Sequence, residues 1–313
     1  MKLLCTDLDR TLLPNGEQPE SPAARAVLWH LLKTHDCELA YVSGRDLNGV
    51  LEAINEYDLA TPAYIAADVG STIYEQENGE WVANTRWTDS IRSDWKGGDT
   101  HSIKNLLDDL PELENQEAKR QSQFKRSYYY DESLDEQELA KPIEEQLVSH
   151  DIEASLVFSH DPEKSVGLLD VLPRSATKRE AVEFLTKLMN LRAEDVLFSG
   201  DSGNDVDAIT AENPSVLVAN ADEATLAAVQ EGVRLAGVEA STCFAKGGVE
   251  INGQALVHAS LPASLNGNYS AGIVEGLLYF RPSWRGDLLN ASWVREALDA
   301  YTSEGTSIRK KSA

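Results

Sequence analysis

Two aspartates separated by a single leucine follow the apolar N-terminal stretch. Asp7 and Asp9 end the segment MKLLCTDLD, whose LLCTD part predicts a buried β-strand. Like charges this close repel, so the pair is either an acidic turn or part of a site whose carboxylates bind a positively charged group. A carboxylate can attack phosphorus, and a second one nearby can move the proton. If the pair belongs to such a site, Asp7 would be the nucleophile and Asp9 the general acid and base of a phosphoryl transfer, and the other motifs of the chain decide between the two explanations.

Three further polar elements stand beside other predicted strands and helices. They are Ser43-Gly44-Arg45 after the strand ELAYV, Lys178 at a helix start, and GDSGND, residues 200–205, after the strand DVLF. Each alone has an ordinary explanation: a helix N-cap, a solvated helix lysine, or a polar turn. Because all of them fall at the carboxyl edge of one predicted parallel sheet, where ligands bind, we expect one site.

The acidic and the phosphate-binding groups of this site can be separated by chemistry. Carboxylates are suitable ligands for Mg²⁺, a hard cation, and the ion would lower the cost of crowding them. The expected metal ligands are Asp7, Asp9, Asp201 and Asp205. Hydroxyls, amide groups and a positive charge would hold the phosphate. The expected phosphate-binding residues are Thr11, Ser43, Gly44, Lys178 and Asn204.

The net charge of −24 limits the partners. It argues against nucleic-acid binding, which needs a basic face. A small anionic substrate would also be repelled at long range, so a cation or a local basic pocket must offset the field. We interpret the charge itself as a heavily solvated acidic surface.

The apolar residues and the cysteines indicate a cytoplasmic protein. No apolar run is long enough to span a membrane, and the N-terminus lacks the pattern of a signal segment. Three cysteines, an odd number, are expected to be free thiols in a reducing compartment: Cys5, Cys37 and Cys243.

Strand and helix patterns alternate at both ends of the chain. The strands LLCTD, ELAYVSG and AYIAAD alternate with helices that begin after Pro22 and near Leu47. The rhythm resumes with a helix over residues 177–189 and the strands DVLFSG and SVLVAN. This order predicts an α/β fold with a Rossmann-like parallel sheet.

The middle of the chain has a different pattern. TIYEQENGEWVAN predicts a hairpin that turns at Asn78-Gly79. The strands SQFKRSYYYD, EASLVFS and VGLLDVLP surround a helix over residues 139–147, which indicates an α+β unit with an antiparallel sheet.

We predict three regions from these patterns. They are a discontinuous core of residues 1–83 and 169–280, an inserted α+β cap of residues 84–168, and a C-terminal extension, 281–313, with one helix and a frayed end.

The four motifs together resemble the haloacid dehalogenase (HAD) superfamily, phosphatases with an aspartate nucleophile. The shared pattern is DxDxT, then Ser or Thr, then Lys, then GDxxxD, and the likeness covers roughly residues 1–280. The insert lies at the second of the superfamily's cap positions and is similar to the cap of the type IIB (Cof-like) subclass. The resemblance implies a Mg²⁺-dependent phosphatase that forms an aspartyl-phosphate.

Within that subclass the chain is most similar to the sucrose-phosphate phosphatase group. The shared segments are LAYVSGR, AADVGSTIY, FKRSYYYD, LLDVLPRSATK and GDSGND. The likeness implies sucrose 6-phosphate as substrate and association with a sugar-phosphate synthase. It also implies that the sugar contacts Arg45, Lys125, Ser127 and Asp170.

Alternatives remain at this point. The group's pattern carries a glutamate where this chain has Thr72, and residues 235–267 form a longer segment than expected. Phosphates of mannosylfructose, glucosylglycerol or mannosylglycerate type are therefore alternative substrates. A sugar phosphomutase and a non-catalytic regulatory module are the alternative functions. For the cap, Lys125 and Arg126 could instead be solvated surface cations, and Tyr128 an ordinary strand aromatic.

Overall fold

The computed structural model contains two compact units. Unit 1 comprises Met1–Ser43, Glu52–Ala63 and the chain from Val182 onward, and unit 2 comprises Gly44–Leu51 and Tyr64–Ala181. The structure describes residues 1–22, 24–161, 165–250 and 264–288.

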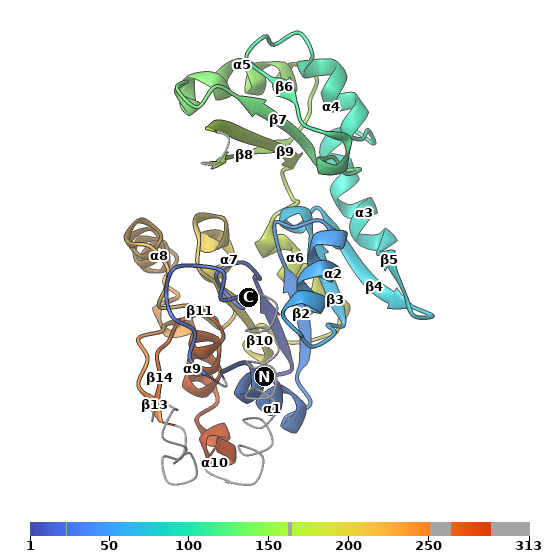
Figure 1. Cartoon of the computed structure of the whole chain (residues 1–313). Coiled ribbons are helices and arrows are strands. Elements are labelled where there is room, and N and C mark those ends of the chain that lie inside the picture. The colour runs from blue at the N-terminus through green and yellow to red at the C-terminus, as the bar shows by residue number, and fades with distance from the viewer. Residues whose placement is uncertain (23, 162–164, 251–263, 289–313) are drawn as a thin grey trace, which may run out of the picture. The chain divides into compact units, whose positions relative to one another are not determined.

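Unit 1 is built on parallel strands in the order β12-β11-β10-β1-β2. Figure 1 labels β11, β10 and β2 of this series. Each strand of this series pairs in parallel with its neighbours, as the sequence predicts. Buried apolar side chains fill the strands, as is typical when both faces of a parallel sheet are covered. The strands are β1 (Leu3–Thr6), β2 (Glu38–Val42), β10 (Val196–Gly200), β11 (Ser215–Leu217) and β12 (Thr242–Phe244).

Helices cover both faces of these strands. On β11, Val216 lies against α9, so closely that a Cβ on Gly276 would stand 2.7 Å from the Val216 Cβ. The neighbouring Ser215 donates a hydrogen bond from its hydroxyl to the Ile209 carbonyl of α7 at 2.7 Å. Successive side chains of a strand point to opposite faces, so α9 and α7 lie on opposite sides. The helices of unit 1 are α1 (Ala24–Thr34), α7 (Val206–Ile209), α8 (Glu223–Ala236), α9 (Ser270–Phe280) and α10 (Arg285–Leu288).

The first part of unit 2 contains an antiparallel ribbon and the two helices that follow it. The predicted hairpin is confirmed, with Asn78 and Gly79 at φ values of 51° and 87° in its turn. The segment after the hairpin, for which the sequence analysis predicts no helix, forms two. The elements are β3 (Tyr64–Ala67), β4 (Thr72–Glu77), β5 (Glu80–Ala83), α3 (Thr85–Arg92) and α4 (Thr100–Leu107).

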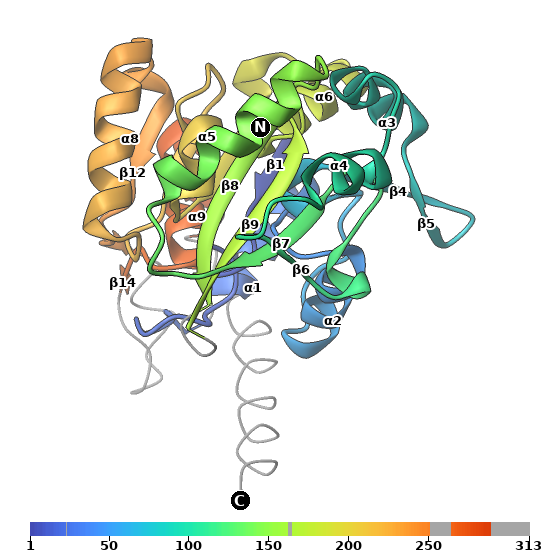
Figure 2. The same ribbon diagram turned by 90° about the horizontal axis from the view of Figure 1, so that it is seen from above.

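The second part of unit 2 is a four-stranded antiparallel sheet in the order β6-β7-β9-β8. Helices α4 and α5 cover one face of it (Figure 2). Tyr128 and Leu169 are paired across β7 and β9 and are buried on this face, whereas Ser127 and Asp170 are paired on the other. The elements are β6 (Glu114–Asn115), β7 (Arg126–Tyr130), α5 (Glu136–Ser149), β8 (Ala154–Asp161) and β9 (Val166–Pro173).

The remaining elements connect these layers. They are α2 (Leu47–Glu56), α6 (Lys178–Leu188), the strand pair β13 (Val249–Glu250) and β14 (Ser264–Leu265), and short 3₁₀ helices that include η1 (Asp68–Gly70), η3 (Ala118–Arg120) and η5 (Gly203–Asp205).

The predicted α/β class, with a parallel sheet and a separate antiparallel sheet, is confirmed. The three cysteines are buried free thiols. No helix in the described ranges is long and apolar enough to cross a membrane. The cap boundaries stay a prediction, and the helix expected in the C-terminal extension lies outside the described residues.

Candidate active site

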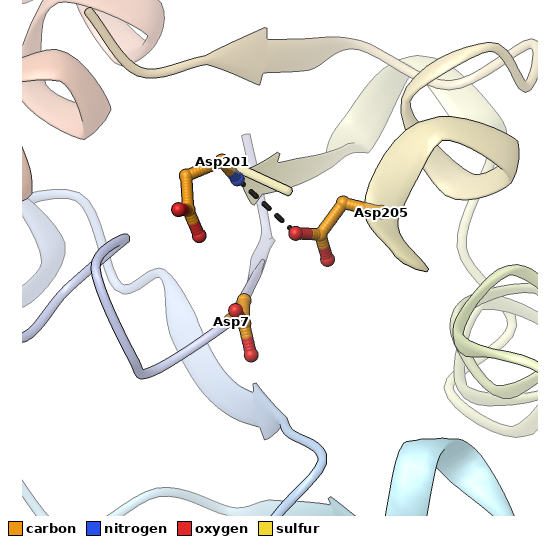
Figure 3. Close-up of side chains that lie close together, drawn as sticks. All are labelled: Asp7, Asp201 and Asp205. Carbon is orange, nitrogen blue, oxygen red and sulfur yellow. Dashed lines mark hydrogen bonds between the residues drawn. The ribbon is translucent and has the colours of Figure 1, made fainter. Parts of the chain in front are cut away.

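Three aspartates at the ends of two neighbouring strands form a carboxylate cluster (Figure 3). The cluster consists of Asp7, Asp201 and Asp205, each of which offers an oxygen within 4.8 Å of the others'. Their exposed fractions are only 5%, 2% and 0%. The predicted meeting of the DLD and GDSGND motifs therefore occurs in the fold.

Strand register explains why these motifs meet. β1 and β10 pair in parallel with Thr6 opposite Ser199, and the Asp7 amide donates to the Ser199 carbonyl at 3.0 Å. Both strands therefore end together, and the residues that follow them leave the sheet at the same edge. This is the edge at which α/β folds bind ligands.

The Asp205 carboxylate is held in the cluster by its own loop. Its Oδ2 accepts hydrogen bonds from the backbone amides of Asp201 and Ser202 and from the Ser202 hydroxyl, each at 3.1 Å. Glycine at position 200 makes this approach feasible, since a Cβ there would lie 2.5 Å from the Asp205 Cβ. The GDSGND loop thus fixes one carboxylate through main-chain donors.

The Asp201 carboxylate is held by the DLDRT loop. The Thr11 hydroxyl, fully buried, donates to Asp201 Oδ1 at 2.8 Å, and Arg10 Nε lies 3.4 Å from Oδ2. Thr11 thus contacts a member of the cluster, and its expected contact with phosphate stays a prediction. Arg10 is a site residue that the sequence analysis missed.

The cluster has the chemistry of a divalent-cation site. Three carboxylates that share a buried space repel one another, and burial of unpaired negative charge is unfavourable. A hard divalent cation with oxygen ligands would offset this cost, and Mg²⁺ is usually bound through one or two carboxylates together with water and substrate phosphate. The donor set of Asp7, Asp201 and Asp205 therefore fits the predicted ion.

Asp9 lies outside the carboxylate cluster and has a separate environment. Its Oδ1 accepts a hydrogen bond from Asn15 Nδ2 at 2.6 Å, and Asn15 Oδ1 in turn accepts one from the Arg10 amide at 2.7 Å. Asn15 therefore holds the second aspartate of the motif at a distinct position. Asp9 as a metal ligand stays a prediction. The sequence signal for Asn15 is weak, because Pro14-Asn15-Gly16 resembles any polar turn.

The loop that carries Arg10 is attached to a distant segment of unit 1. Asn220 Nδ2 donates to the Arg10 carbonyl at 2.6 Å, and Asn220 Oδ1 accepts from the Tyr269 amide at 2.8 Å. The buried Tyr269 hydroxyl donates to the Gln18 carbonyl at 3.0 Å. The pairs Asn220–Arg10 and Tyr269–Gln18 are each separated by more than 200 residues in the chain, so no local pattern could predict them.

The predicted phosphate ligands differ in burial. Ser43 follows β2 directly and is fully buried, and Lys178, the first residue of α6, is only 1% exposed. A solvated helix lysine is therefore the wrong explanation for Lys178. Gly44 and Asn204 are exposed, and Asn204 Oδ1 accepts a hydrogen bond from the Ser202 hydroxyl at 3.1 Å. Their contacts with phosphate stay predictions.

Two of the predicted sugar ligands contact each other in the antiparallel sheet of unit 2. Ser127 on β7 is opposite Asp170 on β9, and its hydroxyl donates a hydrogen bond to the Asp170 carboxylate. Lys125 precedes the same strand and forms an ion pair with Asp68, in which Nζ lies 2.7 Å from Oδ1. Lys125 and Arg126 are both buried, so the solvated-cation alternative is wrong.

The other predicted sugar ligand, Arg45, lines a pocket of about 240 Å³ together with Lys125. We call this the basic pocket. Behind it, burial raises the pKa of the Asp68 carboxyl, and the Lys125 ammonium partly opposes that rise. The basic pocket is lined by Gly44, Arg45, Asp46, Gly49, Lys119, Arg120 and Lys125.

Comparison with protein families gives a match over most of the chain. The model of the sucrose-6F-phosphate phosphohydrolase family matches residues 1–251. A HAD-like hydrolase of Nitrosococcus oceani is 39% identical over 90% of this chain and 72% of its own length. A mannosylfructose-phosphate phosphatase of Agrobacterium fabrum is 30% identical over 66% of this chain and 77% of its own. A sucrose-phosphatase of Arabidopsis thaliana is 26% identical over 72% of this chain, which spans about half (52%) of that protein.

Solved structures give the same fold. The sucrose-phosphatase of Synechocystis sp. PCC6803, determined in complex with sucrose and phosphate, superposes with a TM-score of 0.67 at 23% identity, over 90% of this chain and 98% of that one. A haloacid dehalogenase-like hydrolase of Bacillus subtilis gives a TM-score of 0.59 at 17% identity, over 88% and 90% of the two chains. At these identities the likeness concerns the fold alone.

Proposed function

The chain belongs to the sucrose-6F-phosphate phosphohydrolase family, phosphoric monoester hydrolases of the HAD superfamily, and we propose that it hydrolyses sucrose 6-phosphate with the help of Mg²⁺. The observation that carries the proposal is the carboxylate cluster at the joined ends of β1 and β10. A buried group of like charges is unfavourable unless a cation offsets it, and this motif arrangement is the one expected for phosphoryl transfer to an aspartate.

In the first half-reaction, Asp7 is the nucleophile. A carboxylate oxygen of Asp7 attacks phosphorus, the bond between phosphorus and the sugar oxygen breaks, and Asp9 gives its proton to the departing sugar oxygen. The products of this step are sucrose and an aspartyl-phosphate on Asp7. Asn15 supports the separate role of Asp9, because it holds that carboxyl through a 2.6 Å hydrogen bond outside the cluster.

In the second half-reaction, Asp9 acts as a base. It takes a proton from a water molecule whose oxygen attacks the phosphorus of the aspartyl-phosphate. The bond to Asp7 breaks, inorganic phosphate leaves, and both aspartates return to their starting state. Ser43, Thr11, Gly44, Lys178 and Asn204 are proposed to hold the phosphate oxygens through hydroxyl, amide and ammonium groups.

Mg²⁺ would be held by Asp7, Asp201 and Asp205, with Asp9 as a further proposed ligand. When bound, the ion neutralises negative charge on the phosphate and the carboxylates. The loop hydrogen bonds to Asp201 and Asp205 keep these two carboxylates in place for it.

The sugar is proposed to contact residues of unit 2. In our proposal residues 84–168 form the cap, and Arg45, Lys125, Ser127 and Asp170 contact the sugar. Sucrose 6-phosphate is the first choice of substrate because of the family. Phosphates of mannosylfructose, glucosylglycerol and mannosylglycerate type are the alternatives, and one relative is a mannosylfructose-phosphate phosphatase.

We place the reaction in the cytoplasm, in association with a sugar-phosphate synthase that supplies the substrate. Three buried free thiols support a reducing compartment. A non-catalytic module is the weaker alternative, because the chain keeps both aspartates of DLDRT, Lys178 and both aspartates of GDSGND.

A substrate panel with the full chain tests the proposal. Phosphate release would be measured with sucrose 6-phosphate, mannosylfructose phosphate, glucosylglycerol phosphate and glucose 6-phosphate, with Mg²⁺ and with EDTA. We expect the highest kcat/KM for sucrose 6-phosphate and no turnover in EDTA. A preference for glucose 6-phosphate, or equal rates for all, would overturn the substrate. Conversion of one sugar phosphate into another without free phosphate would indicate a phosphomutase.

A further inference from the structure

The basic pocket has a charge opposite to that of the chain as a whole. Four cationic side chains line it, Arg45, Lys119, Arg120 and Lys125, against one carboxylate, Asp46. The chain carries a net charge of −24. The volume of about 240 Å³ is below the range of about 300–1,000 Å³ for drug-sized ligands. The pocket therefore suits a compact, negatively charged group.

Three of the charged side chains that line the pocket already have partners within the protein. The Lys125 ammonium lies 2.7 Å from a buried Asp68 oxygen, which balances it. Asp46 Oδ1 accepts the Gly49 amide at 2.7 Å, and an Arg45 guanidinium nitrogen donates to the Gly49 carbonyl at 3.2 Å. Arg45, Asp46 and Lys125 therefore already have partners within the protein.

Lys119 and Arg120 differ from these residues. Both are exposed, and within the described ranges neither side chain forms an ion pair or a hydrogen bond. An acidic protein has many carboxylates with which surface cations can pair, as Lys141 does with Glu138. Two adjacent cations without such a partner at one pocket are therefore available to a ligand.

The turn that carries these two cations is held in a fixed position. Gln121 Oε1 accepts the Ser127 amide at 2.8 Å, and Gln121 Nε2 donates to the Ser127 carbonyl at 2.9 Å. The Arg120 carbonyl oxygen lies 3.2 Å from the Ser127 hydroxyl, whose proton is shared with Asp170. One glutamine side chain thus attaches η3 to β7 as a neighbouring strand would, so the turn keeps its place beside the pocket.

We propose that Lys119 and Arg120 form a capture site for the phosphomonoester dianion of an incoming substrate. The inference rests on the proposed function and assigns a binding role to two residues outside the family motifs. A chain of charge −24 repels a dianion at long range. A local positive potential attracts the dianion to the pocket. Such a potential can raise association rates of a charged substrate by about 10- to 1,000-fold, and the effect depends steeply on ionic strength.

The chemistry of Lys119 and Arg120 favours a phosphate over the neutral sugar. Arginine and lysine side chains offer hydrogen-bond donors and no acceptors. The oxygens of a phosphate dianion accept hydrogen bonds, whereas sugar hydroxyls both donate and accept. Among the residues that the structure describes, Lys119 and Arg120 have no carboxylate paired with them, so they suit a phosphate. Arg45 and Lys125, which line the pocket together with Asp46, are the residues proposed to contact the sugar.

The test measures the salt dependence of catalysis in the full chain. The variant Lys119→Ala/Arg120→Ala would be compared with wild type and with Lys141→Ala, which removes one exposed cation of the same unit away from the pocket. At low salt we expect kcat/KM for sucrose 6-phosphate to fall about tenfold in the double variant, with kcat within about twofold. Near 0.5 M KCl the difference should shrink to about twofold, because salt screens the field. Equal kcat/KM and equal salt slopes in all three proteins would overturn the inference.

Product inhibition distinguishes a phosphate ligand from a sugar ligand. We expect competitive inhibition by inorganic phosphate to weaken in the double variant, while inhibition by sucrose is unchanged. Weaker inhibition by sucrose alone would overturn the inference and assign Lys119 and Arg120 to the sugar. Loss of a non-competitive component of phosphate inhibition would also overturn it, because the ligand would then be free phosphate at a regulatory site.

Two further measurements keep this inference separate from the proposed function. p-Nitrophenyl phosphate carries the dianion without a sugar, so the same salt series can be run even if sucrose 6-phosphate is not hydrolysed. Titration of sulfate, a dianion that does not react, into wild type and the double variant reports binding without turnover. Equal sulfate affinity would contradict the capture site, whereas a lack of phosphate release from every ester would contradict the proposed function alone.

Discussion

The carboxylate cluster of unit 1 and the basic pocket of unit 2 differ in the sign, the burial and the pairing of their charged groups. In the cluster, three buried groups of the same sign share one space, and main-chain amides and the loop residues Thr11 and Arg10 hold two of them. In the pocket, one buried cation is balanced by Asp68, and two exposed cations stand on a turn attached by Gln121.

This difference indicates how each region would respond to its ligand. The cluster is built around an unfavourable repulsion that a bound cation would relieve, so its energetics should depend strongly on metal. The pocket contains one cation, Lys125, that Asp68 neutralises, and two exposed cations, so its ligand would meet cations that water partly screens. We therefore expect changes in the cluster to have large, metal-dependent effects and changes at the two exposed cations of the pocket to have smaller, salt-dependent ones.

Replacement of the expected nucleophile should have the largest effect. Asp7→Asn keeps the shape of the side chain but removes the attacking oxygen and one of the three buried charges. We expect phosphate release to fall by at least about a thousandfold. In EDTA we expect the thermal midpoint of the variant to equal or exceed that of wild type, because a repelling charge has gone.

The control for this change is Glu212→Gln, which removes an exposed negative charge from unit 1. It should leave both activity and the thermal midpoint unchanged. Mg²⁺ should stabilise wild type and Glu212→Gln more than Asp7→Asn. Turnover at the wild-type rate in Asp7→Asn would show that Asp7 is not the nucleophile. Equal stabilisation of Asp7→Asn and wild type by Mg²⁺ would show that Asp7 is not a metal ligand.

The buried ion pair behind the basic pocket provides the second prediction. Asp68→Asn leaves the Lys125 ammonium buried without its partner, and we expect the free energy of unfolding to fall by about 3–5 kcal/mol. Asp68→Asn/Lys125→Met removes both charges and should be closer to wild type than Asp68→Asn. Urea unfolding of the wild type, both single variants and the double variant would measure the coupling. A double variant as unstable as the sum of the two single ones would show that the two residues act independently.

Glu138→Gln serves as the matched control, because Glu138 forms an ion pair with Lys141 on the exposed surface of the same unit. Exposed pairs contribute little to stability, so this variant should unfold like wild type.

The same contrast explains what could be predicted from sequence. The cluster arises from contiguous motifs at strand ends, and parallel pairing of β1 with β10 is enough to bring DLD and GDSGND together. The alternation of apolar stretches and turn residues also predicted the parallel sheet, the hairpin at Asn78-Gly79 and the antiparallel strands of unit 2. These features depend on local patterns and on general rules of strand connection.

The features that sequence reasoning missed depend on tertiary contacts. Asn220 contacts Arg10 of the DLDRT motif and Tyr269 contacts Gln18, each across more than 200 residues. Asn15 acts through a side chain that any turn could contain. Helix α4 lies in a charged segment whose few apolar residues, such as Ile103 and Leu107, are buried only because the antiparallel sheet is present. No single-sequence pattern contains the partner that makes such contacts favourable.

A close approach in the cluster provides the third prediction. In Gly200→Ala the new methyl group would lie 2.5 Å from the Asp205 Cβ, so the Asp205 carboxylate must move. We expect the free energy of unfolding to fall by about 1–3 kcal/mol and the Mg²⁺ affinity to fall about 10- to 100-fold. Gly203→Ala is the control, because a Cβ at that position has no neighbour within 4 Å. Calorimetric titration of Mg²⁺ into the three proteins would measure the difference, and equal affinities would mean that the position of Asp205 does not matter for the ion.

The smallest expected effect concerns Asn15, which holds Asp9 apart from the cluster. Asn15→Ala removes the 2.6 Å hydrogen bond to Asp9 Oδ1 and leaves the carboxyl without that support. We expect kcat for sucrose 6-phosphate to fall about tenfold with little change in KM, at the lower end of what removal of a supporting hydrogen bond causes, because Asn15 is exposed.

The leaving group distinguishes a role in proton transfer from a structural role. p-Nitrophenolate leaves without a proton, so formation of the aspartyl-phosphate from its ester should be nearly as fast in Asn15→Ala as in wild type, whereas formation from sucrose 6-phosphate should be slow. Rapid-quench measurement of the first turnover with both esters would resolve this, with Asn48→Ala, an exposed asparagine of α2, as the control. An equal slowing with both esters would mean that Asn15 only supports the loop. A selective slowing with the sugar ester would instead connect the asparagine to the proton that Asp9 moves, and would separate the function of Asp9 from that of the cluster beside it.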